Sequence, residues 1–197
     1  MARTVNHARR EQKKSEIIIA AMQCFAEKGF HSTSMQDVCR AISMSPGSLY
    51  RYFSSKDEII IAIVEEERRQ DDEFARQITN SGSLFGALEK LISHVIQQSN
   101  EPGYTQLSAE IYAEINRNEK ATAIASEAHT LAADAVAFAI NKAIENEEID
   151  STWDPEALAE VLIVLIDSLD TRPMFTKKAS DKAIHKTVIK LIGSIRN

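Results

Sequence analysis

The sequence predicts an all-α fold of about nine helices. The first observation is that its 197 residues include only six glycines and four prolines. The second is that apolar residues recur at intervals of three and four, as on one face of a helix, whereas no run alternates like a half-buried strand. Hydrophobic residues make up 44% of the chain and charged residues 26%, which is typical of a globular protein with one or two domains.

The charge is divided unevenly along the chain. Residues 1–56 hold nine Lys and Arg against four Asp and Glu, whereas residues 57–197 hold 14 against 25. A basic block on an acidic body indicates a polyanionic partner at one end, although a basic face can equally be merely solvated. We predict one domain at 1–56, with a basic arm at 1–14, and a second at 57–197.

Features of other classes of protein are missing from the sequence. No apolar run reaches the roughly 18–20 residues of a membrane span, and the N-terminus lacks the apolar region and cleavage site of a signal peptide, so we expect a cytoplasmic protein. Cys24 and Cys39 lie in helical patterns without metal-ligand spacing, and we interpret them as small buried side chains, with a thiol switch as the alternative. We expect no metal and no cofactor.

The first helix is predicted from Glu11 to Lys28, because Ile17, Ala21, Cys24 and Phe25 form one apolar stripe. Gly29 follows it as a C-terminal cap. The N-terminal arm from Arg3 to Lys14 is predicted to be disordered, and it could follow a nucleic-acid backbone or enter a minor groove. Its five cations are Arg3, Arg9, Arg10, Lys13 and Lys14.

The segment SPGSLYRYFSSKDE (45–58) predicts the rest of a helix-turn-helix. A second helix begins after the N-cap Ser34, and a third of about two turns begins at Pro46 after the N-cap Ser45. Leu49 and Phe53 are expected to point inward, which leaves the tyrosines outside. A fourth helix starts at the capping box of Ser55 and Glu58. Five further helices are predicted near 83–99, 104–117, 119–147, 155–172 and 180–196.

A short exposed helix with small residues at its start and hydroxyl and guanidinium donors after them suits the major groove of DNA. The alternative is a plain helical corner whose tyrosines pack on a neighbour. Residues 32–59, STSMQDVCRAISMSPGSLYRYFSSKDEI, resemble the DNA-binding signature of the tetracycline-repressor (TetR) family of bacterial transcriptional regulators. The likeness covers about residues 11–65, and it departs from the family at Ser43, where glycine is usual.

The resemblance implies a set of DNA-contacting positions. We add Arg51 to this set, because its guanidinium is expected to be exposed and can donate hydrogen bonds to phosphates or base edges. Gln36, Pro46, Gly47 and Ser48 would lie nearest the base edges, and part of the specificity would come from DNA shape. The full set is Ser34, Gln36, Ser45, Pro46, Gly47, Ser48, Tyr50, Arg51, Tyr52 and Lys56.

The C-terminal part is predicted to dimerise, because two reading heads on a two-fold axis are needed to read a palindrome. Residues 153–169 are similar to the helix that such regulators use to dimerise, and the helix there is apolar on most of its circumference. A buried core within one chain is the alternative. The predicted interface comprises Leu158, Val161, Leu162, Leu165, Leu169, Ile184, Val188, Leu191 and Ile192.

The central helices are predicted to hold a small-molecule effector. For each candidate side chain, ordinary packing or surface exposure remains the alternative, and the shared face of Glu110 and Glu114 could favour a cationic ligand. The candidates are Phe85, His94, Tyr104, Leu107, Glu110, Ile111, Tyr112 and Phe138.

The resemblance implies a mechanism in which a homodimer binds a palindromic operator in double-stranded DNA and a ligand releases it, with activation as the alternative to repression. An enzyme is disfavoured, because the sequence has no HExxH, no cluster of Cys and His, and no Gly-rich phosphate loop. A helical scaffold without DNA binding is the remaining class. The sequence identifies neither the operator nor the effector.

Overall fold

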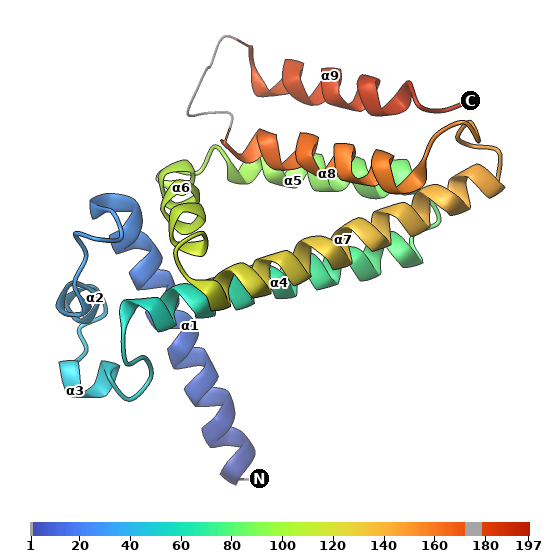
Figure 1. The fold of residues 1–197 in the computed structure, drawn as a ribbon. Helices are drawn as coiled ribbons and strands as arrows, with labels where there is room; N and C mark the ends of the chain where they lie inside the picture. The colour runs from blue at the N-terminus through green and yellow to red at the C-terminus, as the bar shows by residue number, and fades with distance from the viewer. Residues whose placement is uncertain (1, 172–178) are drawn as a thin grey trace. The chain divides into compact units, whose positions relative to one another are not determined.

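The computed structural model describes residues 2–171 and 179–197, with side chains from His7 onward. These residues form nine α-helices and no β-strand, apart from one isolated bridge between Ile149 and Arg196 (Figure 1). The all-α prediction is therefore confirmed. The side chain of Arg3 and the predicted helix end at Arg172 lie outside the described residues. The helices are α1 (Ala2–Lys28), α2 (Met35–Ala41), α3 (Pro46–Leu49), α4 (Lys56–Asn80), α5 (Leu84–Gln98), α6 (Tyr104–Ile115), α7 (Glu119–Glu145), α8 (Pro155–Thr171) and α9 (Asp181–Gly193).

The N-terminal segment differs from the prediction, because it is helical instead of a disordered arm. Helix α1 begins at Ala2. The segment contains no glycine or proline, and its Arg, Gln, Lys and Glu residues are good helix formers. Ion pairs within the helix add to this, with Lys13 Nζ 2.6 Å from Glu16 Oε2 and Lys14 Nζ 3.4 Å from Glu11 Oε1.

Helix α3 is shorter than the predicted two turns. It ends at Leu49, and the chain continues as a turn in which the Tyr52 N–H donates to the Leu49 carbonyl at 2.8 Å. The next cap then begins α4: the Ser55 hydroxyl accepts from the Glu58 N–H at 3.2 Å. Tyr50, Arg51 and Tyr52 therefore lie at and beyond the end of the helix.

The chain folds into two compact units. Unit 1 contains residues 1–66 and 106–124, and unit 2 contains residues 67–105 and 125–197. Helices α4, α6 and α7 each contribute residues to both units. The domain boundary near residue 56 stays a prediction.

Unit 1 has an apolar core beneath its helix-turn-helix. Helix α1 packs against α2, and α2 packs against α3. Cys24 and Cys39 are buried without a disulfide, which confirms the prediction of small buried side chains. Burial raises the pKa of both thiols, so the reactive thiolate forms less readily. The largest side chains of this core include Ile17, Phe25, Val38, Leu49 and Ile59.

Unit 2 has its own core around α5, which packs against α8 and α9. Leu88 and Ile92 of α5 are almost completely buried there. The C-terminal residues close this core, because the Arg196 guanidinium carbon lies 3.9 Å from the centre of the Phe85 ring. The isolated bridge between Arg196 and Ile149 holds the same end.

Helix α7 is the one described helix that is long and apolar enough to cross a bilayer. Core helices of soluble proteins pass the same test of length and composition. Val136 and Ile140 of this helix belong to the core of unit 2, while 28% of its most apolar stretch is buried within the chain. A single helix of this length and composition is weak evidence for a membrane span.

Candidate nucleic-acid interface

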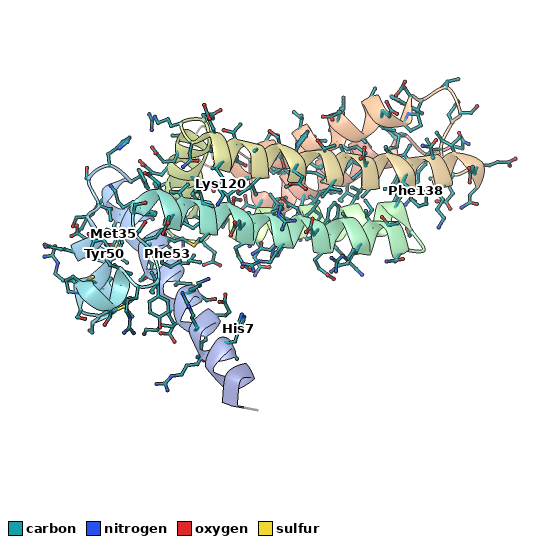
Figure 2. The ribbon with its side chains drawn as sticks, turned by 60° about the horizontal axis from the view of Figure 1, so that its bottom comes forward. His7, Met35, Tyr50, Phe53, Lys120 and Phe138 are labelled. Carbon is teal, nitrogen blue, oxygen red and sulfur yellow. The ribbon has the colours of Figure 1, made fainter. Side chains whose placement is uncertain are left out.

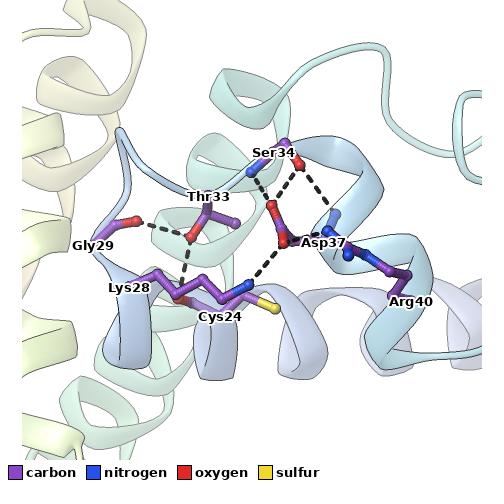
Figure 3. Close-up of polar contacts among 7 residues, drawn as sticks. All are labelled: Cys24, Lys28, Gly29, Thr33, Ser34, Asp37 and Arg40. Carbon is purple, nitrogen blue, oxygen red and sulfur yellow. Dashed lines mark hydrogen bonds and ion pairs between the residues drawn. The ribbon is translucent and has the colours of Figure 1, made fainter.

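The start of α2 is fixed by a polar network around Asp37 (Figure 3). The Ser34 hydroxyl accepts from the Asp37 N–H, and the Asp37 carboxylate accepts from both the N–H and the hydroxyl of Ser34. The same carboxylate accepts from Lys28 Nζ at 2.7 Å and from Arg40 Nη2 at 2.8 Å. The hydrogen bond from Lys28 is the main reason that the pKa of the Asp37 carboxyl lies well below its usual range, and the hydrogen bonds from Ser34 lower it further. The predicted cap at Ser34 is confirmed, and α2 is tied to the end of α1.

A second set of contacts fixes the loop between α1 and α2. Gly29 has a φ of +80°, the left-handed conformation that ends α1. The Thr33 hydroxyl donates to the Gly29 carbonyl at 2.8 Å and the Cys24 carbonyl at 3.1 Å (Figure 3). Thr33 itself is 1% exposed. The loop that leads from α1 into α2 is therefore held by hydrogen bonds from Thr33 to the end of α1.

The turn between α2 and α3 contains a residue in the left-handed conformation, and this residue is a serine instead of the glycine usual in the family. Ser43 has a φ of +51°, and the Met44 N–H donates to the Cys39 carbonyl at 2.9 Å. A side chain at such a φ costs free energy, because its Cβ crowds the backbone. The turn expected from the resemblance is thus formed in spite of the departure at Ser43.

We expect Ser43→Gly to raise the free energy of unfolding by about 0.5–1 kcal/mol, because glycine adopts this φ without steric cost. For a chain of this length, the gain corresponds to a rise of roughly 1–4 °C in melting temperature. Ser43→Ala keeps the Cβ and serves as the control, with no comparable gain. Thermal unfolding of the three proteins checks the prediction, and equal stability of the glycine variant and wild type would contradict it.

Helix α3 presents a polar surface above an apolar base. The Ser45 hydroxyl accepts from the Ser48 N–H at 3.3 Å, as predicted for an N-cap. Leu49 is 0% exposed and Phe53 5%, whereas Tyr50 is 53% exposed (Figure 2). A Cβ placed on Gly47 would meet no atom within 4 Å. The glycine is therefore not required by packing inside the chain, and the space in front of it is open to a partner.

The structure brings nine of the ten predicted DNA-contacting residues to the α2–α3 surface, with their side chains exposed or half-buried. Lys56 differs from the others. Its Nζ donates to the Phe30 carbonyl at 2.5 Å and the His31 carbonyl at 3.3 Å, and it lies 4.5 Å from the centre of the Phe30 ring. The ammonium of Lys56 thus holds the α1–α2 loop from its position at the start of α4.

Helix α6 holds the same loop from another direction. Glu110 Oε2 accepts from the Phe30 N–H at 2.7 Å. Glu114, which is 7% exposed, accepts from Arg117 and lies 3.3 Å from His31 Nε2. The sequence left open whether these glutamates favour a cationic ligand or form a solvated acidic face, and in the structure their carboxylates bind residues of the chain itself. Sequence reasoning missed this role, because contacts separated by 80 residues leave no local pattern.

The other predicted effector residues are distributed over both units. Three of them belong to unit 1, where Leu107 and Ile111 are buried and Tyr112 is exposed. The other four, Phe85, His94, Tyr104 and Phe138, belong to unit 2. Phe85 is buried in the core of unit 2 beneath Arg196, and Tyr104 is half-buried. His94 is exposed, and so is Phe138, which is labelled in Figure 2. Lys142 Nζ lies 5.9 Å from the centre of the Phe138 ring. Most of these side chains are either packed in a core or exposed at the surface, which are the alternatives to ligand contact that the sequence analysis left open.

Unit 2 instead gathers carboxyl groups that the sequence analysis had not singled out. Burial, reinforced by Asp71 and Asp170, raises the pKa of Glu67 to about 7. Burial raises the pKa of Asp167 to about 6 and also raises that of Asp71, while the charge of His129 opposes both shifts. All three side chains are nevertheless exposed on the surface of the single chain, so neighbouring protein removes only part of their solvation. The carboxyl groups come from α4 and α8, and His129 comes from α7.

The predicted dimer residues divide into two groups. Leu158, Leu162, Leu169, Val188 and Ile192 lie in the core of unit 2, because their helices first bury a stripe against α5 within the same chain. A residue buried there is not available to a partner. The apolar positions that remain accessible are the exposed Val161 and Leu191 and the half-buried Leu165 and Ile184, together with Val164, which is 61% exposed.

Comparison with known proteins identifies the helix-turn-helix. Residues 17–63 match the family described as "Bacterial regulatory proteins, tetR family". The regulator UidR of Escherichia coli K12 is 30% identical over 154 residues, which cover 77% of this chain and 76% of UidR. The chain belongs to the TetR family. Salmonella enterica GusR has 28% sequence identity and a TM-score of 0.71, over 92% of this chain and 94% of GusR.

A third TetR-fold neighbour was solved with a ligand. Bacillus subtilis FadR in complex with stearoyl-CoA has a TM-score of 0.75 at 20% identity, over 91% of this chain and 97% of FadR. At that identity the likeness concerns the fold alone. The matched relatives are transcriptional regulators and not enzymes, so this TetR-family chain is a helix-turn-helix DNA-binding regulator of transcription.

Proposed function

We propose that this regulator is a cytoplasmic repressor that binds a palindromic operator as a homodimer and is released by a small-molecule effector. The observation that carries the proposal is the α2–α3 surface: a capped helix pair on a buried base, with open space at Gly47 and an exposed Tyr50. A pre-formed surface loses little conformational freedom when it enters a major groove.

The proposed contacts follow from what each exposed group can donate. The hydroxyls of Tyr50 and Tyr52 and the guanidinium of Arg51 suit phosphates, whereas Gln36 at the start of α2 suits a phosphate or a base edge. Two such surfaces in a dimer would read half-sites about 34–36 Å apart. Few of these groups make bidentate base contacts, so sequence-dependent DNA shape would supply part of the specificity.

We propose that the effector acts on unit 2, because α4, α6 and α7 run from that unit into the DNA-binding unit. The effector must bind the DNA-incompetent state more tightly, because only a difference in affinity can shift the equilibrium. The carboxyl groups of Glu67, Asp71 and Asp167 favour an effector that carries positive charge or hydrogen-bond donors.

The test is a selection of bound fragments from random or genomic DNA with the purified protein, repeated with Tyr50→Ala/Tyr52→Ala. We expect an enriched palindrome that the double variant binds at least 10²-fold more weakly, because each protomer loses two phosphate donors. Trp153→Ala, which removes an exposed aromatic residue from unit 2, is the control and should retain the motif. Failure of the wild-type dimer to enrich any motif would contradict the proposal.

A further inference from the structure

The first half of α1 forms one wall of an open depression in unit 1. The depression has a volume of about 760 Å³. Its other wall is the turn that follows α3, which contributes Arg51 and Tyr52. The residues from α1 are Arg9, Arg10, Gln12, Lys13 and Glu16. We call this feature the α1 basic depression.

The charge of the α1 basic depression is strongly one-sided. Four cations line it against the single carboxylate of Glu16, which already binds Lys13 Nζ at 2.6 Å. Arg9, Arg10 and Arg51 are exposed, and none of the three forms an ion pair with an acid among the described residues. A second depression in unit 1, of about 420 Å³, instead mixes Arg117 and Lys120 with three carboxylates.

We propose that the α1 basic depression binds phosphates of the DNA backbone, so that α1 is a second DNA-contacting element beside the helix-turn-helix. The inference rests on the proposed function. Three unpaired guanidiniums around one open recess suit phosphate oxygens, which accept two parallel N–H donors from arginine. The hydroxyl of Tyr52 adds a neutral donor on the same wall.

The position of the depression argues for DNA as its occupant. Arg51 and Tyr52 follow directly after Tyr50, so one turn joins the exposed surface of α3 to the wall of the depression. A duplex that meets α3 therefore has a phosphate strand available to the same turn. Because α1 is already helical there, binding would not require the ordering that a flexible basic arm needs.

The experiment measures operator affinity as a function of salt concentration for wild type and Arg9→Gln/Arg10→Gln. Glutamine keeps helix propensity and length while removing the charge. The double change removes two cations per protomer, or four per dimer. We expect the slope of log K against log salt to become less steep by about 3.6, with affinity lower by roughly 10²- to 10³-fold near physiological salt. The selected motif should stay the same, because phosphate contacts carry no base sequence.

The matched control is Arg76→Gln/Lys90→Gln, which removes the same charge from exposed positions in unit 2. We expect the slope and affinity of this control to stay close to those of wild type. A Gln variant that binds the motif with an unchanged slope would overturn the inference and leave the proposed function intact. Equal loss in the variant and the control would also overturn it, since the general field of the protein would then explain both. If the wild-type protein enriched no motif, the result would instead contradict the proposed function.

A thermal melt of each variant accompanies the binding measurements. Both side chains are exposed, so the melting temperatures should agree with that of wild type. Inorganic phosphate provides a further check, because it competes weakly for single phosphate contacts. If millimolar phosphate protected Arg9 and Arg10 from chemical modification while operator DNA did not, the depression would be a site for a free anion and the inference would be overturned.

Discussion

Replacing Val161 and Val164 by aspartate is expected to convert the proposed homodimer into monomers and to weaken operator binding by roughly 10²- to 10⁴-fold. The two valines lie three residues apart on α8, and each keeps more than 60% of its surface exposed in the single chain. Two large apolar side chains side by side on one helix face indicate a contact that the chain does not make with itself. Carboxylates buried at that contact would lack partners.

The loss of affinity follows from the geometry of a two-headed binder. Once one reading head is bound, the second binds at a high effective concentration, which contributes a factor of about 10²–10⁴. Monomers lose that factor even though each α2–α3 surface is unchanged. Sedimentation measures the oligomeric state, and titration of operator DNA measures the affinity.

The control for the aspartate variant is Ile19→Asp, which places a carboxylate at another apolar position, 57% exposed on α1 in unit 1. The control should remain dimeric. Because Val161 and Val164 contribute little to the core of the protomer, the melting temperature of the variant monomer should not collapse. A dimer that survives both aspartates would contradict the proposed interface.

The helix-turn-helix could be predicted from the sequence because its signals are local. A cap at Ser34, a proline at the first position of α3 and an inward pair at Leu49 and Phe53 depend only on neighbouring residues, and all are found in the structure. The position of Ser43 shows the limit of such reasoning. The sequence departs from the family by having serine where glycine is usual, and the surrounding hydrogen bonds nevertheless hold this residue at positive φ.

Roles that depend on distant parts of the chain could not be predicted in the same way. Leu158 and Leu162 were assigned to the dimer because an apolar stripe indicates burial without saying what buries it, and α5 supplies the partner. Lys56 lies within the DNA-binding signature, but its ammonium donates to carbonyls 25 and 26 residues away. Glu67 and Asp71 are exposed residues in a run of charges, and only the fold brings the protein and the further carboxylate, Asp170, that raise the pKa of Glu67.

Glu110→Ala is expected to lower the free energy of unfolding by about 2 kcal/mol, because a hydrogen bond to a charged acceptor contributes roughly 1.5–3 kcal/mol. The variant leaves the half-buried Phe30 N–H without its acceptor on α6. For a chain of this length the loss corresponds to roughly 4–8 °C in melting temperature. Hydrogen exchange of the Phe30 amide should become faster at the same time, since the loop between α1 and α2 is then held on fewer sides.

Glu110→Gln is the matched comparison, because its amide oxygen can still accept from the Phe30 N–H while the charge is removed. We expect its stability and exchange rate to lie between those of wild type and Glu110→Ala. Measurement of operator affinity shows whether the contact between Glu110 and Phe30 only stabilises unit 1 or also positions the α2–α3 surface for DNA. The loop leads directly into the cap of α2 at Ser34, so a loop released from α6 should leave the α2–α3 surface intact but less firmly placed on α1, and affinity should fall in the same order. If all three proteins bound the operator equally, the contact would stabilise unit 1 without influencing DNA recognition.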